Sequence, residues 1–215
     1  IKESDDFYTK PFANQENLQL AKQLLEKAEV TRSFKHVLTE RMVEYCYFHE
    51  EQTRELDAWL ISLNPGELTK KTRVYLIELC IIRGYSKEAF EYVSAYGSDG
   101  ISPDLLLKMT VRRITETLYE YSETLVNLCV RLLQAEQVHE TLLRYLCMHY
   151  VGPTQDMYNL LCAAYDAKAD SKDLAARVVT QMLFTGKIDH LEEAYEISKK
   201  SHCVCLLYTS DAADD

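Results

Sequence analysis

The chain has 215 residues, of which 47% are hydrophobic, and its 24 Lys and Arg against 34 Asp and Glu give a formal net charge of −10 at pH 7. This length and apolar content can bury a substantial core, while only six Gly and four Pro argue against a disordered chain or a turn-rich β-sandwich. The acidic balance argues against a nucleic-acid partner, because such binding depends on cations that neutralise phosphates, and no stretch approaches the roughly 20 apolar residues of a membrane span.

Apolar residues at helical spacing predict helices along the chain. The first begins after Asn14 and ends near Glu29, the second spans about 33–49, and the third spans about 51–63 before a turn at Asn64. Small polar residues that favour N-caps mark further starts, at Thr69, Ser86, Ser102, Ser122, Thr154 and Ser171, and glycines mark stops, at Gly84, Gly97, Gly152 and Gly186. Nothing alternates with period two, so we expect an all-α chain of ten or eleven short helices in antiparallel hairpins.

An internal repeat is indicated by glycines that close the first helix of each pair, because Gly152 and Gly186 are 34 residues apart and Gly84 lies twice that distance before Gly152. Four columns at this period are wholly apolar: Val43, Ile77, Val111, Tyr145, Val179; Cys46, Cys80, Ile114, Met148, Met182; Ala58, Tyr92, Val126, Leu160, Ala194; and Ile61, Ala95, Cys129, Ala163, Ile197. Chance would produce roughly one such column. The prediction is an α-solenoid of antiparallel helix hairpins with a period of about 34 residues.

One segment resembles a known repeat. Residues 75–80, followed by Gly84, residues 88–90 and residues 100–104, are similar to one pentatricopeptide unit, and the two-helix period is similar to the tetratricopeptide class. The chain departs from the tetratricopeptide pattern because Gly closes the first helix and only one unit ends in Pro, at Pro103. It therefore resembles a degenerate array of these classes, and its Tyr-rich acidic texture is also similar to large helical-repeat proteins of anaerobic Firmicutes.

The residues at the two ends of the chain indicate where the folded array begins and ends. The chain begins at Ile1 rather than at a methionine, so we expect a fragment of a longer protein. Residues 205–215, CLLYTSDAADD, resemble the translation of a transposase-type sequencing adapter. We therefore expect the helical-repeat array to occupy residues 1–204 and residues 205–215 to lie outside the fold.

No constellation in the sequence points to catalysis, a cofactor or a metal. The six histidines form no HExxH motif and no pair at i, i+4, and the chain contains no CxxC. Adjacent acids such as Glu50 and Glu51 point apart on a helix, and the stretch 97–100 lacks the Lys and the preceding strand of a phosphate loop. We expect no enzyme activity and assign no catalytic, cofactor-binding or metal-ligating residue. Cysteines within apolar helical patterns favour reduced thiols and a cytoplasmic location.

Two sets of side chains are open to alternative interpretations. The tyrosines either fill contacts between helices or line a peptide-binding groove, with core packing favoured, and they are Tyr45, Tyr47, Tyr92, Tyr96, Tyr119, Tyr121, Tyr145, Tyr150, Tyr158, Tyr165 and Tyr195. The arginines of the middle of the chain either recognise an acidic peptide or balance nearby Glu, and they are Arg112, Arg113, Arg131 and Arg144.

The best-supported function is a scaffold whose concave face, formed mainly by the first helices of the pairs, binds a protein or peptide whose identity and contact residues stay unknown. The first alternative is an RNA-binding array of pentatricopeptide type, which the similarity of residues 75–104 implies. The second alternative is a regulatory arm of a larger enzyme whose catalytic domain is missing from this chain.

Overall fold

The computed structural model describes residues 15–185, except 28, 30, 117–121, 135–138 and 151, together with 192, 193, 195–197 and 199. Within this part of the chain every regular element is a helix, so the all-α prediction is confirmed there. The chain divides into two compact units, residues 1–105 (unit 1) and residues 106–215 (unit 2). The helix stop expected at Gly186 and the segment 205–215 lie outside the described residues.

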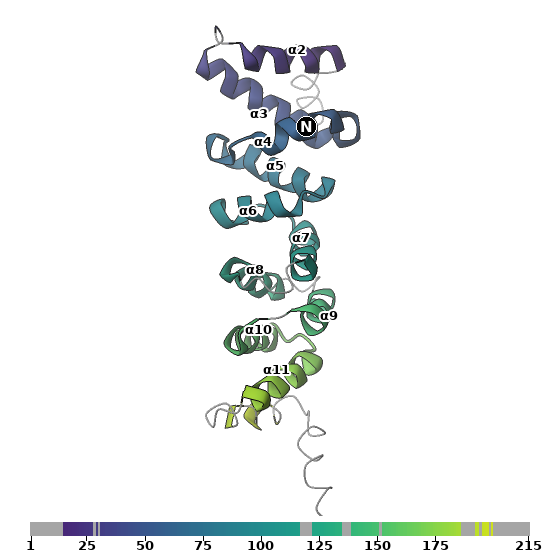
Figure 1. Cartoon of the computed structure of the whole chain (residues 1–215), viewed down its shortest axis with the longest axis vertical. Helices are drawn as coiled ribbons and strands as arrows, with labels where there is room; N and C mark the ends of the chain where they lie inside the picture. The colour runs from purple at the N-terminus through teal and green to yellow at the C-terminus, as the bar shows by residue number, and fades with distance from the viewer. Residues whose placement is uncertain are drawn as a thin grey trace, which may run out of the picture. The chain divides into compact units, whose positions relative to one another are not determined.

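Unit 1 is a stack of short helices centred on a long pair. The helices are α2 (Gln15–Glu26), α3 (Arg32–Phe48), the 3₁₀ helix η2 (Glu50–Leu56), α4 (Asp57–Ser62), the 3₁₀ helix η3 (Pro65–Glu67), α5 (Lys70–Arg83) and α6 (Ser86–Tyr96). Helix α3 packs against α2 and α5, and α5 packs in turn against α6 (Figure 1). Met42 and Val43 of α3 and Leu76 and Ile77 of α5 are fully buried, so the α3–α5 contact is the centre of this core.

Unit 2 repeats the same mode of packing. Helix α7 (Pro103–Glu116) runs from unit 1 into unit 2 and is followed by α8 (Glu123–Leu133), α9 (His139–His149), α10 (Thr154–Asp166) and α11 (Lys172–Thr185). Helix α8 packs against both α9 and α10, and α11 packs against both α9 and α10 (Figure 1). Leu133, Leu142, Leu146, Leu160 and Val178 have no exposed surface, so leucines from successive helices fill this core.

The predicted helix ends agree closely with the structure. Thr69 caps α5, Ser86 and Thr154 are the first residues of α6 and α10, and Ser122 is the N-cap of α8. Gly84 and Gly97 follow α5 and α6 with φ of +91° and +83°, a left-handed conformation that glycine adopts without the steric cost of a Cβ. Small polar caps and glycine stops therefore located these boundaries from local chemistry alone.

The third predicted helix, over about 51–63, is wrong in its first half. Residues Glu50–Leu56 form a 3₁₀ helix, and only Asp57–Ser62 is α-helical. Thr53 breaks the helix, with φ −118° and ψ 17°, because its hydroxyl donates to the carbonyl of His49 at 3.0 Å and so competes with the backbone ladder. A β-branched residue with a local hydrogen-bond partner thus shortens this helix.

The four apolar columns predicted from the repeat are only partly buried. Val43, Ile77 and Val179 of the first column lie in the core, as do Cys46, Cys80 and Met182 of the second. Met148, which also belongs to the second column, is 57% exposed. In α9 the buried face is formed by Leu142, Leu143 and Leu146 instead, so this helix is rotated relative to the predicted register. Ala58 and Ala95 are also exposed, and Ala194 lies outside the described side chains.

A buried arginine joins the end of α3 to α5. The Arg83 side chain is 1% exposed, and its Nη2 donates to the carbonyl of Glu50 at 2.9 Å and to the hydroxyl of Thr53 at 2.6 Å. Its Nη1 donates to the carbonyl of Thr53 at 3.2 Å and forms an ion pair with Asp57, whose other oxygen accepts from Tyr85 at 2.8 Å. The guanidinium therefore supplies donors to backbone carbonyls and balances a half-buried carboxylate.

Unit 2 contains a second arginine of the same kind. Arg177 of α11 donates through Nη1 to the carbonyl of Leu146 at 2.9 Å and to that of Cys147, and through Nη2 to the carbonyl of Tyr150. These carbonyls form the end of α9, where the helix dipole is negative and its last carbonyls lack donors within the helix. In both units, an arginine on one helix donates to backbone carbonyls about 30 residues earlier in the chain, in the 3₁₀ helix after α3 in unit 1 and at the end of α9 in unit 2.

We predict that Arg83→Met destabilises unit 1 by about 3–5 kcal/mol, because it leaves Asp57 and two carbonyls without their cationic donor in a buried setting. Trp59, the single tryptophan of the chain, lies in α4 and reports unfolding of this unit in urea by its fluorescence. The control is Arg54→Met, which removes an exposed arginine paired with Glu51 three residues away and should leave the midpoint close to wild type. Equal midpoints for both variants would show that the carbonyls find other donors.

Candidate partner-binding surface

Large apolar side chains lie exposed along one face of α3. Phe34, Val37 and Phe48 are 51%, 55% and 55% exposed, and their spacing of 3 and 11 residues places them on one stripe of the helix. Arg41 and Glu44 lie between them on the same stripe and form an ion pair at 2.8 Å. We call Phe34, Val37 and Phe48 the α3 ridge. Large exposed apolar groups interspersed with charges on one helix face are candidates for an interaction site.

One end of the α3 ridge continues onto α5 through an aromatic cluster. The rings of Tyr47 and Tyr75 stack with centroids 4.3 Å apart, and Phe48 meets Tyr75 edge-on at 5.7 Å. Lys71 lies 5.3 Å above the Tyr75 ring and pairs with Glu44 at 3.1 Å. The aromatic groups are therefore held in place by neighbours from two helices, as expected of a preorganised contact surface.

Behind this cluster, Glu78 is a buried carboxylate with both oxygens engaged. It is 6% exposed, and it accepts the Tyr47 hydroxyl at 2.6 Å and the backbone N–H of Ser102 at 2.9 Å. The hydrogen bond to Glu78, followed by burial, raises the pKa of Tyr47 to about 12. The Glu78 carboxylate thus fixes Tyr47 and the start of α7 to α5, and both of its hydrogen bonds serve to hold these segments together.

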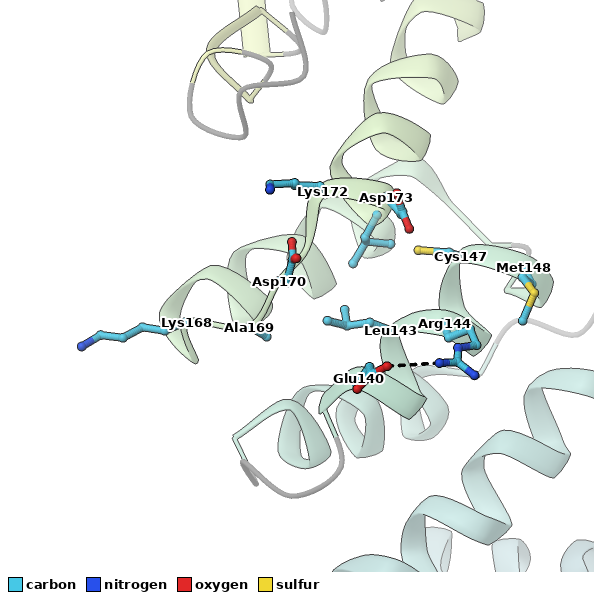
Figure 2. Close-up of a pocket in the computed structure, with 11 residues that line it drawn as sticks. Glu140, Leu143, Arg144, Cys147, Met148, Lys168, Ala169, Asp170, Lys172 and Asp173 are labelled. Atoms are coloured by element: carbon cyan, nitrogen blue, oxygen red, sulfur yellow. Dashed lines mark hydrogen bonds and ion pairs between the residues drawn. The ribbon is translucent and has the colours of Figure 1, made fainter. Parts of the chain in front are cut away.

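Unit 2 has a broad groove between α9 and the start of α11, with a volume of about 780 Å³. Figure 2 shows Leu143, Cys147 and Met148 projecting from α9, Asp173 of α11 facing Cys147, and Asp170 on the α10–α11 connection. The groove holds acids and bases together, and one of its ion pairs, Glu140 to Arg144 at 3.1 Å, is visible in Figure 2. Its mixed charge favours no single ligand.

The thiol in this groove is held in its neutral form. Burial, together with the nearby carboxylate of Asp173, raises the pKa of Cys147 to about 11, and Arg177 acts in the opposite direction. Burial likewise raises the pKa of Cys129 to about 12 and that of Cys80 to about 12. A cysteine acts as a nucleophile as its thiolate, so this environment gives Cys147 the properties of a structural thiol.

The tyrosines singled out in the sequence divide between core and surface. Tyr45 and Tyr150 are 5% exposed and pack inside, whereas Tyr96 and Tyr195 are 40% and 50% exposed. The remaining described members are half-buried, namely Tyr47, Tyr92, Tyr145, Tyr158 and Tyr165, while Tyr119 and Tyr121 lie outside the described residues. Tyr45 and Tyr150 therefore belong to the core, most of the other described tyrosines lie at its edge, and Tyr47 and Tyr75 contribute to the candidate surface.

The arginines of the middle of the chain are engaged by neighbouring acids rather than gathered into one patch. Arg112 pairs with Glu116 at 2.6 Å and Arg144 pairs with Glu140 at 3.1 Å, each four residues apart on its own helix. The structure thus supports the balancing role for these two residues. Among the described residues no group of three His, Cys, Asp or Glu side chains could hold a metal ion, and none of the described helices has the length and apolarity needed to cross a bilayer.

Sequence reasoning did not find Arg83, Arg177, the α3 ridge or Glu78. The ridge carried a signal, since Phe34, Val37 and Phe48 share a helical stripe distinct from that of Met42 and Val43. The arginines carried none, because an arginine that caps a distant helix has no characteristic local spacing.

Two family models match the chain, both described as a family of unknown function, DUF5717. The model of its N-terminal part matches residues 1–120, and the model of its C-terminal part matches residues 122–205. No curated protein and no solved structure matches the chain. The junction of the two matches falls after α7, whereas the compact units divide inside that helix, between residues 105 and 106.

We predict that Cys147 reacts roughly ten-fold more slowly with iodoacetamide at pH 8 than an unperturbed cysteine, since a pKa of about 11 leaves little thiolate, although that thiolate is more nucleophilic. Mass spectrometry of the modified peptide measures the rate. Asp173→Asn should speed labelling by lowering the pKa of Cys147, whereas the nearby Asp170→Asn serves as the control. Labelling of native Cys147 as fast as that of urea-unfolded chain would contradict the prediction.

Proposed function

This chain belongs to the DUF5717 family, and we propose that it is a helical-repeat scaffold that binds a protein or peptide. The observation that carries the proposal is the α3 ridge with its aromatic continuation on α5. Phe34, Val37 and Phe48 are each more than half exposed although the same helix buries Met42 and Val43 completely. Ordered, exposed aromatic groups beside charged residues supply binding energy to protein interfaces at little entropic cost.

The proposed architecture is an α-solenoid with a period of about 34 residues, in which α3, α5, α7, α9 and α11 are the first helices of successive hairpins. These helices end at Phe48, Arg83, Glu116, His149 and Thr185, so successive ends are 33–36 residues apart. Within each unit a first helix also contacts the next first helix, α3 with α5 and α9 with α11. Nearest-neighbour packing at a steady chain interval supports stacked repeats.

RNA is the second candidate partner because residues 75–104, which resemble a pentatricopeptide unit, coincide with α5, α6 and the start of α7. The charges beside the α3 ridge favour a protein instead. Arg41 and Lys71 beside the ridge are both paired with Glu44, so the ridge offers no excess of positive charge to a phosphate backbone. A scaffold of this kind would also serve as the regulatory arm of a larger enzyme, where its partner would be a catalytic domain.

A cytoplasmic location forms part of the proposal. The five cysteines in the described part of the chain are all free thiols, three of them buried. Reduced cysteines of this kind are usual in reducing compartments.

We predict that replacing Phe34, Val37 and Phe48 together by Ala abolishes capture of the partner in crosslinked pull-downs from the native cell. The free energy of unfolding should change by less than about 0.5 kcal/mol per site, because the side chains are mainly exposed. Quantitative mass spectrometry of the captured proteins is the measurement. Phe184→Ala is the matched control, since Phe184 is 87% exposed on α11 and belongs to unit 2 rather than unit 1.

Three outcomes would count against the proposal. Capture of the same proteins by the triple variant would remove the ridge as the binding surface. Failure of the native chain to enrich any protein, or the enrichment of RNA that the same triple variant loses, would overturn the scaffold reading itself.

A further inference from the structure

A second surface in unit 1 differs from the α3 ridge in its chemistry. The first half of α3 and residues 63–68, which connect α4 to α5, enclose a cleft of about 460 Å³. Arg32, Lys35 and His36 line it from α3, on the side of the helix opposite Phe34 and Val37. The cleft is therefore separate from the ridge, although both belong to the same helix.

The loop side of this cleft is held rigid by an arginine and a tyrosine. Arg73 donates through Nε to the carbonyl of Pro65 at 2.9 Å and through Nη2 to that of Leu68 at 3.0 Å. Its guanidinium also lies 4.6 Å from the ring of Tyr96, whose hydroxyl reaches Asn64 at 3.4 Å. A wall fixed before binding reduces the entropy lost when a ligand is ordered against it.

Next to the cleft, Glu40 of α3 binds the N-terminus of α5. Its carboxylate accepts the backbone N–H of Thr69 at 2.5 Å, the Thr69 hydroxyl at 2.9 Å and the Thr72 hydroxyl at 3.0 Å. The same carboxylate is 3.9 Å from His36 Nε2. The negative charge of Glu40 is thus directed at the positive N-terminus of α5 and is taken up by hydrogen bonds there.

The charges on the α3 side run against local stability. Arg32 and Lys35 occupy the first turn of α3, which contains no acidic residue, although cations at this end are repelled by the helix dipole. Helix α5 likewise has no acid in its first turn, whereas α6, α7, α8, α9, α10 and α11 each carry one there. Among the described residues, neither Arg32 nor Lys35 has an ion-pair partner. Residues that break a local rule without compensation within the fold are expected at binding sites.

We propose that this cleft binds an acidic segment of a partner protein, with Arg32 and Lys35 pairing with its carboxylates and His36 contacting it beside them. The inference rests on the proposed scaffold function and adds the chemistry of the partner. Charge complementarity is the argument: in a chain of net charge −10, Arg32 and Lys35, which have no ion-pair partner among the described residues, line a cleft whose lining contains one acid, Glu67. The acidic remainder of the chain would repel an RNA, whereas a short peptide needs to contact only the cleft.

The test uses the whole chain and a fluorescein-labelled twelve-residue peptide rich in Asp and Glu, with fluorescence anisotropy at low salt as the readout. A peptide with Asn and Gln in place of the acids is the neutral probe, and oligouridylate of equal charge is the nucleic-acid probe. The double variant Arg32→Gln/Lys35→Gln should weaken binding of the acidic peptide about five-fold or more. It should also raise the melting temperature or leave it unchanged, because it removes cations from a helix N-terminus.

The matched control is Lys87→Gln/Lys108→Gln, which alters the net charge by the same amount at two exposed lysines outside the cleft. This control should weaken binding of the acidic peptide by less than about two-fold. Equal losses in both double variants, no binding of the acidic peptide, or tighter binding of oligouridylate that the cleft variant loses would each overturn the inference.

The two proposals fail separately. If the native partner is captured by the Arg32→Gln/Lys35→Gln variant and lost by the triple variant of the α3 ridge, the scaffold function stands and the acidic-segment inference falls. If the chain captures no partner, the scaffold function fails whatever the peptide does.

Discussion

The carbonyl groups at the ends of helices are the constraint on which the packing of each unit depends. A helix leaves its last carbonyls without donors, and burying them unsatisfied is costly. Arg83 supplies donors to the backbone that follows α3, and Arg177 supplies them to the end of α9. Because Arg83 belongs to α5 and Arg177 to α11, each set of hydrogen bonds both satisfies backbone carbonyls of an earlier segment and fixes the position of the later helix beside it.

This arrangement decides which surfaces are left for a partner. Helix α3 buries Met42 and Val43 against α5, so its opposite stripe, with Phe34 and Val37, stays exposed. The break at Thr53, which Arg83 holds, redirects the chain into α4 and then into the loop that forms the wall of the basic cleft. The ridge and the cleft are therefore two consequences of how the end of α3 is tied down.

Electrostatics in unit 1 follow the same division between structure and surface. Glu40, Glu44 and Glu78 are each engaged by donors from α5 or from the start of α7, so these acids serve to hold helices together. Arg32 and Lys35 have no such partner among the described residues, although the chain as a whole is acidic. Local charge, rather than net charge, is what distinguishes the cleft.

The sequence by itself determined the helical class and most helix boundaries, because periodic apolar residues, polar N-caps such as Thr69 and glycines such as Gly84 act within a few residues of where they stand. It did not determine the 3₁₀ segment at Glu50–Leu56, the rotation of α9 that exposes Met148, or the positions of Arg83 and Arg177. The two arginines bind carbonyls about 30 residues away, and no local pattern records such a contact. The cleft likewise arises only when residues 63–68 fold back beside α3, since its walls come from segments that the sequence keeps apart.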